Sequence, residues 1–152
     1  MKLVDLLSQD AISTDLKAQE KKTVLEELCG LLSSTRKLAN PEDMVQVLME
    51  RESLGSTGIG QGVAIPHAKS AAVKDQVAAL AISRRGIDFD ALDGEPVYII
   101  FLLVAPADAA GNHLKALAKI SRLLKDKFFR QALRDAKSAE EILKIIREED
   151  EY

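Results

Sequence analysis

Apolar residues recur at helical spacing in the first third of the chain. Between residues 17 and 32 they are separated by Glu and Lys, which predicts an amphipathic helix. The apolar positions of this helix are Val24, Leu25, Leu28, Leu31 and Leu32. A second helix is predicted from Asn40-Pro41 to about Glu52, because asparagine is a good N-cap and proline suits the first helical position.

Three apolar runs in the middle of the chain predict β-strands, at residues 63–65, 76–83 and 97–105. The third run, VYIIFLLVA, is apolar throughout, as in a strand that is covered by helices on both faces. Pro66 follows the first run, and we expect it to end the ladder pairing there because proline has no N–H.

The last third of the chain has the pattern of helices. One is predicted from His113 onward, and a short one contains Phe128 and Phe129. A final helix begins at a capping box, in which Ser138 and Glu141 would each satisfy the other's backbone donor. This order of elements predicts an α/β fold, a single-domain sandwich with a central mixed β-sheet flanked by helices on both faces.

Length and charge narrow the class of protein. The 152 residues fit one domain, which we expect to span residues 1–152. Twenty-four acidic against 21 basic residues give a net charge of -3, which argues against nucleic acid or an anionic membrane as the main partner. The run at 97–105 has about half the length that a membrane-spanning helix needs, and the N-terminus does not resemble a signal peptide. We therefore expect a cytoplasmic protein without membrane insertion.

The candidate chemistry lies at the two histidines of the chain. His67 follows a segment with four glycines in the eight residues 55–62, and His113 stands at the start of a predicted helix. Both lie at element boundaries, so each could project into solvent close to the other. A neutral imidazole is a nucleophile near neutral pH, and glycine N–H groups or a helix N-terminus can hold an anion. These features suit a phosphoryl group carried transiently on nitrogen.

The same residues have other interpretations. A lone histidine is more often a surface or hydrogen-bonded residue, and the glycines alone could form a tight turn. A Walker loop would need glycine at Val63 and Ala68, and the dinucleotide fingerprint would need Gly or Ala at Val63. Two histidines without a His-Glu-x-x-His spacing do not predict zinc, and the single cysteine, Cys29, excludes an internal disulfide and a multi-cysteine metal site. No metal or cofactor is expected.

A longer motif gives the histidine a context. Residues 52–68, ESLGSTGIGQGVAIPHA, resemble the phosphohistidine signature of the enzyme IIA components of the bacterial phosphotransferase system. The similarity is to the fructose/mannitol type (type 2), which includes nitrogen-regulatory members. It extends to residues 87–97, 101–106 and 113–118, and covers roughly residues 40 to 145. Ala68 stands where many members have glycine, a replacement that the pattern tolerates.

This resemblance implies roles for three side chains. His67 would accept a phosphoryl group from phospho-HPr, or from a nitrogen-type paralogue, as a tele-phosphohistidine, and pass it to an enzyme IIB. His113 would donate a hydrogen bond to the phosphate. Arg51 would help to hold the anion through its fork of donors, its alternative being a solvated charge at a helix end.

Further binding positions are implied less directly. Thr57 would either touch the phosphate with its hydroxyl or cap the loop, and Gly60 and Gly62 are candidate phosphate-binding positions in the glycine-rich segment. The family also implies an apolar collar around the phosphorylated histidine, where partner proteins dock. Candidates for this collar are Ile59, Val63, Ile65 and Ala68, some of which must belong to the core.

Two functions share this predicted site. The first is a phosphotransferase component that carries phosphate for sugar uptake, and the second is a nitrogen-regulatory module that binds regulatory protein targets according to its phosphorylation. The sequence of residues 55–60 and 87–93 is more similar to the nitrogen-regulatory members than to the sugar-uptake members. A domain that has lost phosphotransfer is disfavoured because both histidines are present.

Overall fold

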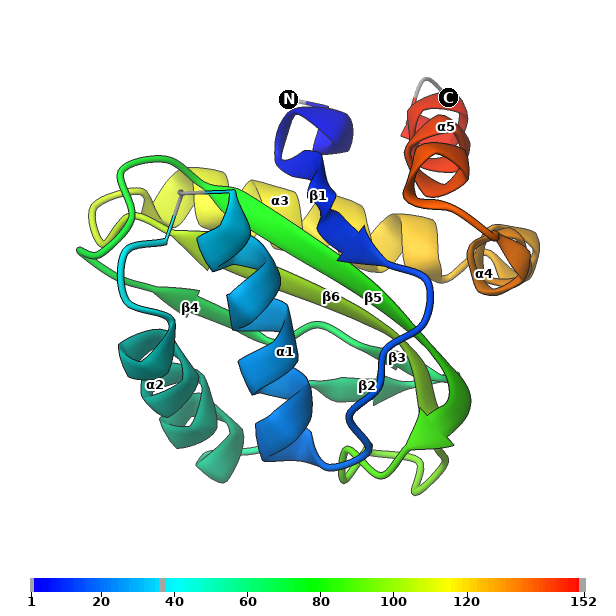
Figure 1. Ribbon diagram of the computed structural model, residues 1–152, viewed down its shortest axis with the longest axis horizontal. Coiled ribbons are helices and arrows are strands. Elements are labelled where there is room, and N and C mark those ends of the chain that lie inside the picture. The colour runs from blue at the N-terminus through cyan, green and yellow to red at the C-terminus, as the bar shows by residue number, and fades with distance from the viewer. Residues whose placement is uncertain (1, 36–37, 151–152) are drawn as a thin grey trace.

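One mixed β-sheet organises the chain in this computed structural model, which describes residues 2–35 and 38–150 (Figure 1). Its strands are β1 (Leu7–Ser13), β2 (Gly58–Gly60), β3 (Val63–Ala64), β4 (His67–Lys69), β5 (Val77–Ile87) and β6 (Val97–Ala105). The order is β1-β5-β6-β3-β2, and β4 also pairs with β6. β1 is parallel to β5, and β3 and β4 are parallel to β6, whereas β5 is antiparallel to β6 and β2 to β3.

Helices cover both faces of this sheet. On the face nearest the viewer in Figure 1 lie α1 (Lys21–Ser34) and α2 (Pro41–Ser53). The other face packs against the short 3-10 helix η1 (Leu3–Asp5), α3 (Ala110–Leu124), α4 (Lys127–Asp135) and α5 (Ala139–Asp150). The predicted α/β sandwich with a central mixed sheet is confirmed.

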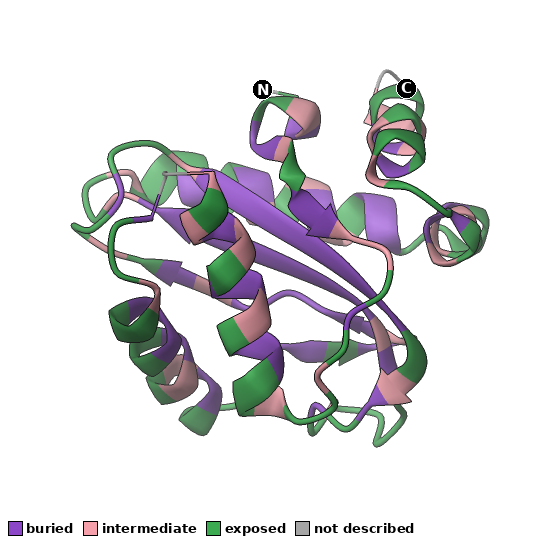
Figure 2. Ribbon diagram, viewed as in Figure 1, coloured by how far each residue is buried: buried purple, intermediate pink, exposed green. Residues whose placement is uncertain are grey.

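The strand β6 is the centre of the core. Alternate side chains point to opposite faces of a strand, so Ile100 and Leu102 pack with α1 and α2 while Phe101 and Leu103 pack with the other helices. Every residue of β6 except Tyr98 is buried, as the purple strands of Figure 2 show. The prediction of a strand covered on both faces is therefore confirmed.

The helix caps follow the sequence with one difference. The Asn40 side chain accepts a hydrogen bond from the Asp43 N–H at 3.3 Å, as expected for the N-cap of α2. At α5, the Ser138 hydroxyl accepts from the Glu141 N–H at 3.1 Å. The Glu141 carboxylate, however, accepts from the Lys137 N–H at 3.0 Å, because its side chain reaches past the cap to the preceding donor. The reciprocal bond of the predicted capping box is thus displaced by one residue.

The chain resumes pairing directly after Pro66, which the sequence did not predict. β3 ends at Ala64, two residues before the proline. The Pro66 carbonyl then accepts from the Leu103 N–H at 3.0 Å, and His67 pairs with Leu103 in β4. His67 is therefore a strand residue and not the first residue of a loop. The strands β1 and β2 were not predicted either.

No helix in residues 2–35 and 38–150 is long and apolar enough to cross a membrane.

Candidate functional site

His67 and His113 lie side by side at one end of the sheet. Because β4 runs parallel to β6, its first residue, His67, lies beside Leu103 near the C-terminal end of β6. The connection after β6 leads into α3, whose first turn carries His113. The centroids of the two imidazole rings are 5.6 Å apart, with 49° between the ring planes. The topology thus brings together the two histidines that the sequence singled out.

The tautomer of the neutral His67 ring is set by the backbone carbonyl of Ile65. The ring Nδ1 lies 2.7 Å from the carbonyl oxygen of Ile65. A carbonyl oxygen can only accept, so the neutral ring carries its proton on Nδ1 and leaves the lone pair on Nε2. The His67 side chain is half-buried, which leaves part of the ring accessible. The nitrogen that this backbone contact leaves without a proton is therefore Nε2.

His113 is buried, contrary to the expectation that it would project into solvent. Only 5% of its surface is exposed, and it lies within the first turn of α3, which begins at Ala110. Burial lowers the pKa of His113 below its usual value, and the neighbouring charges of His67 and Lys69 lower the pKa further. Its ring is therefore neutral at neutral pH. Among the described residues, its Nδ1 has no hydrogen-bond partner.

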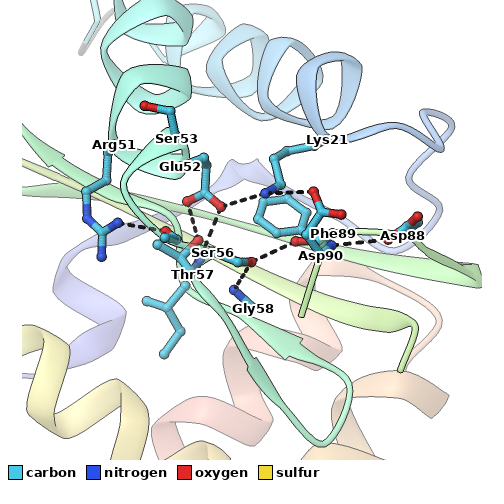
Figure 3. A network of polar contacts seen from close by, with 12 residues as sticks. Lys21, Arg51, Glu52, Ser53, Ser56, Thr57, Gly58, Asp88, Phe89 and Asp90 are labelled. Atoms are coloured by element: carbon cyan, nitrogen blue, oxygen red, sulfur yellow. Dashed lines mark hydrogen bonds and ion pairs between the residues drawn. The ribbon is translucent and has the colours of Figure 1, made fainter. Parts of the chain in front are cut away.

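Arg51 lies in the last turn of α2, as predicted. Its Nη1 donates to the carbonyl oxygen of Gly55 at 2.8 Å, which closes the turn that follows the helix (Figure 3). The helix α2 packs against β4, the strand that begins with His67. The hydrogen bond to Gly55 uses one of the five N–H donors of the guanidinium, and within residues 2–35 and 38–150 it is the one hydrogen bond that this group makes.

Thr57 is buried and its donors point away from solvent. Only 3% of the residue is exposed, its N–H donates to Glu52 Oε1 at 3.1 Å, and its hydroxyl donates to Glu52 Oε2 at 2.5 Å (Figure 3). Of the two roles expected for Thr57, these contacts fit the loop-stabilising one. The hydroxyl proton is already committed to a carboxylate.

Gly60 and Gly62 lie at the other end of the ladder from His67, contrary to their expected place at the phosphate. Val63 pairs with Ile99 and His67 with Leu103, a separation along β6 of about 13 Å. Both glycines have positive φ, +103° and +81°, and form the turn between β2 and β3. They are turn residues, because an L side chain rarely adopts such angles.

The expected apolar collar is mostly core. Val63, Ile65 and Ala68 are buried, whereas Ile59 is 46% exposed. Leu114, next to His113, is 66% exposed and was not predicted. The sequence gives no local signal for this exposure, because the spacing of Leu114 with Leu117 and Leu124 predicts a place on the apolar face of the helix.

Sequence reasoning also gave no role to Glu52, the acidic residue that opens the motif. Glu52 is only 7% exposed and forms an ion pair with Lys21, whose Nζ lies 3.2 Å from Oε1. The same ammonium lies 3.3 Å from Asp90 Oδ2 and 4.9 Å from the centroid of the Phe89 ring. Glu52 thus joins α1 and α2 to the segment that leads into β2 (Figure 3).

No cluster of three or more His, Cys, Asp and Glu side chains that could hold a metal ion occurs in the part of the chain that the structure describes.

A histidine pair between a sheet strand and a helix start, with Nε2 of one ring unprotonated, is a site suited to carrying a phosphoryl group. Residues 5–149 match the family model described as "Phosphoenolpyruvate-dependent sugar phosphotransferase system, EIIA 2". The chain therefore belongs to the type 2 EIIA family of phosphotransferase-system phosphocarriers.

Individual relatives come from both branches of this family. The chain is 37% identical over 150 residues to the fructose-specific EIIABC component of Bacillus subtilis, covering 99% of this chain but only 24% of that protein. It thus spans about a quarter of that relative. It is also 40% identical over 146 residues to a nitrogen regulatory protein of Bradyrhizobium diazoefficiens, covering 96% of this chain and 95% of the relative.

Solved structures share the fold. Nitrogen regulatory protein IIA-Ntr from Neisseria meningitidis superposes with a TM-score of 0.88 at 39% identity, covering 94% of this chain and 97% of that one. Enzyme IIAMtl of Escherichia coli, solved in complex with phosphorylated enzyme IIBMtl, gives a TM-score of 0.76 at 19% identity, covering 92% and 96%. At that identity the second likeness concerns the fold alone.

Proposed function

We propose that this chain accepts a phosphoryl group on Nε2 of His67 from phospho-HPr, or from a nitrogen-type paralogue, and passes it to an enzyme IIB. The observation that carries the proposal is the 2.7 Å contact between His67 Nδ1 and the Ile65 carbonyl. This contact holds the proton of the neutral ring on Nδ1, so the lone pair of Nε2 can attack without a separate base.

The proposed step is an in-line displacement between two imidazoles. The Nε2 lone pair attacks the phosphorus of the donor's phosphohistidine, and the donor's N–P bond breaks as the new N–P bond forms. The donor ring leaves as a neutral imidazole that keeps the proton on its other nitrogen. His67 keeps its own proton on Nδ1, directed at the Ile65 carbonyl. Such a transfer depends mainly on positioning and on electrostatic stabilisation of the phosphoryl oxygens.

His113 would stabilise the transferred group. Its ring is neutral, because burial lowers its pKa, so it carries one N–H that can be directed at a phosphate oxygen. A hydrogen bond to a charged group contributes about 1.5–3 kcal/mol. Arg51 would add a positive charge from the end of α2, which packs against the strand of His67.

The class of partner protein is supported by a relative of the same fold and by an exposed apolar side chain near the site. The E. coli relative in complex with phosphorylated enzyme IIB supports a docking partner of this class for the same fold. The exposed side chain of Leu114, beside His113, supports an apolar contact next to the site. Enzyme IIB and the phosphoryl donor would use this contact in turn.

A nitrogen-regulatory role is the second candidate, in which phosphorylation of His67 mainly controls binding to a regulatory protein. Its support is the similarity to two nitrogen regulatory proteins at 40% and 39% identity, each covered over at least 95% of its length. Both candidates use the same histidine, so the site alone does not separate them.

One experiment tests both. The protein is incubated with labelled phosphoenolpyruvate, enzyme I and HPr, and separately with the nitrogen-type paralogues of these two proteins. We expect an acid-labile, base-stable adduct on the wild type and none on His67→Ala. Equal labelling of His67→Ala would refute the proposal. Addition of enzyme IIB then separates the candidates, because a sugar-uptake component passes on its phosphate whereas a regulatory module retains it.

A further inference from the structure

We propose that Glu52 is a positioning residue for phosphoryl transfer, which acts on His67 through Thr57 and Ile65. The transfer part of this inference rests on the function proposed above. The positioning part concerns the unphosphorylated protein and stands on its contacts alone.

The first link is a buried carboxylate with three donors. The Thr57 N–H and hydroxyl reach Glu52 at 3.1 and 2.5 Å, and the Lys21 ammonium reaches it at 3.2 Å (Figure 3). All three groups donate, which the ionised carboxylate satisfies because it only accepts. With Glu52 and Thr57 both buried, the bonds are protected from competing water. Thr57 is therefore held at its backbone and at its side chain by one carboxylate.

The second link runs from Thr57 to the histidine. The Thr57 carbonyl accepts from the Ile65 N–H at 3.0 Å, and the Ile65 carbonyl accepts from His67 Nδ1 at 2.7 Å. The residue before a proline is confined to extended conformations, so Ile65 has little freedom apart from these contacts. A continuous series of hydrogen bonds thus connects Glu52 to the ring of the phosphoryl acceptor.

This connection has a chemical consequence. The Ile65 carbonyl decides which ring nitrogen of His67 carries the proton, and hence that Nε2 is the nucleophile. A group that hydrogen-bonds the non-reacting ring nitrogen of a histidine fixes both the orientation of the ring and its tautomer. In metal sites, the loss of such a group lowers activity or metal affinity about 10–100-fold. A shift of Thr57 would move Ile65 and admit the other tautomer, in which Nε2 carries the proton and cannot attack.

The test uses two variants and a matched control. Thr57→Val removes only the hydroxyl donor and keeps the Glu52–Lys21 ion pair, whereas Glu52→Gln removes the charge on which the three donors converge. Asp90→Asn is the control, because Asp90 is the other carboxylate that pairs with Lys21 and does not contact Thr57. The Asp90 side chain is 76% exposed, whereas that of Lys21 is 14% exposed. Thr57→Ser keeps a hydroxyl and should behave as the wild type.

The first measurement is the tautomer of His67 by imidazole 1H–15N correlation spectra of the unphosphorylated proteins above the histidine pKa. The chain has two histidines, so a His113→Gln variant assigns the signals. We expect a single Nδ1–H form in the wild type and Asp90→Asn, and a mixture of tautomers in Thr57→Val and Glu52→Gln. The second measurement is the transfer rate from phospho-HPr. We expect kcat to fall about tenfold in both variants with an unchanged KM for the donor.

The outcomes are separable. A folded Thr57→Val with the unchanged single Nδ1–H form and wild-type kcat would overturn the positioning role. Because this variant retains the buried ion pair, it decides the matter even if Glu52→Gln does not fold. Failure of the wild type to accept phosphate on His67 would instead refute the proposed function, and the tautomer spectra would still decide the role of Glu52.

Discussion

The imidazole rings of His67 and His113 lie 5.6 Å apart, but the first is half-buried and the second is 5% exposed. A docked protein can therefore reach the ring of His67, while His113, in the first turn of α3, is buried. This difference in exposure separates the roles of two residues of the same chemical type. The accessible ring suits exchange with partners, and the covered ring suits a fixed donor.

The role of His113 predicts a graded response to substitution. His113→Gln retains an N–H donor and should keep much of the transfer rate, whereas His113→Ala should be about 10- to 100-fold slower, the loss of one hydrogen bond to a charged group. Rapid-quench phosphorylation of both variants measures this. Equal rates for the wild type, Gln and Ala would leave His113 with a structural role only.

A substitution of Arg51 should change the rate of phosphoryl transfer without changing the stability of the fold. Arg51→Lys keeps a cation at the end of α2 and a donor for the Gly55 carbonyl, so the melting temperature should barely change. The fork of donors that suits phosphate is lost, so the phosphoryl transfer rate should fall severalfold. Thermal melts and transfer rates are compared in one preparation. If transfer is unaltered, Arg51 only closes the turn.

Burial of His113 predicts a pH dependence of stability. Its pKa in the folded protein lies below the ordinary value of 6.5, so the unfolded chain binds this proton more readily. The free energy of unfolding should therefore be highest above pH 6.5 and should decrease as the pH falls from there toward the folded pKa. Urea unfolding between pH 8 and pH 5 measures the slope, with His113→Gln as the control that lacks this group. Parallel slopes for the two proteins would contradict the prediction.

Cys29 provides a sensor of unfolding. It is fully buried in α1, and burial raises the pKa of its thiol to about 12. The thiolate is the reactive form, so a neutral solution of native protein should not react with a thiol reagent on the timescale of minutes. Complete reaction should follow in denaturant. Rapid labelling of a variant without denaturant would reveal that its fold is damaged, which makes this assay a control for the substitutions above.

Phosphorylation should act locally. It adds about 1.5–2 negative charges at one half-buried residue of β4, and the core on both sides of the sheet is continuous. Amide hydrogen exchange should change within residues 55–70 and around residue 113 and should remain unaltered in α5. Changes throughout α5 would indicate a global rearrangement instead.

The elements that the sequence predicted well are those whose own residues carry the signal, such as a continuous apolar run or a helix cap. The strand at 97–105 was predicted with its observed bounds because all its positions are apolar, and α2 because Asn40 and Pro41 mark its start. The strands β2 and β4 have three residues each, too few to show a periodicity along the chain. β2 pairs with the adjacent strand β3, whereas β4 pairs with the distant strand β6.

In the site, too, some residues could be identified from the local sequence and others only from the fold. The motif identified the histidines, but glycines that serve a turn and glycines that hold an anion have the same local pattern. Only the register against β6 places Gly60 and Gly62 away from His67. The partner of Glu52, Lys21, comes from a different helix, and no spacing along the chain connects them.

The two ends of the described chain are joined by the carboxylate of Asp150. It accepts from the Leu3 N–H at 2.7 Å and pairs with Lys119 of α3 at 2.6 Å, with its side chain 1% exposed. A growing polypeptide emerges from the ribosome with its N-terminus first, so α3 and η1 are made before the residue that fastens them together. The helix that carries His113 therefore gains this anchor only when synthesis has passed residue 150.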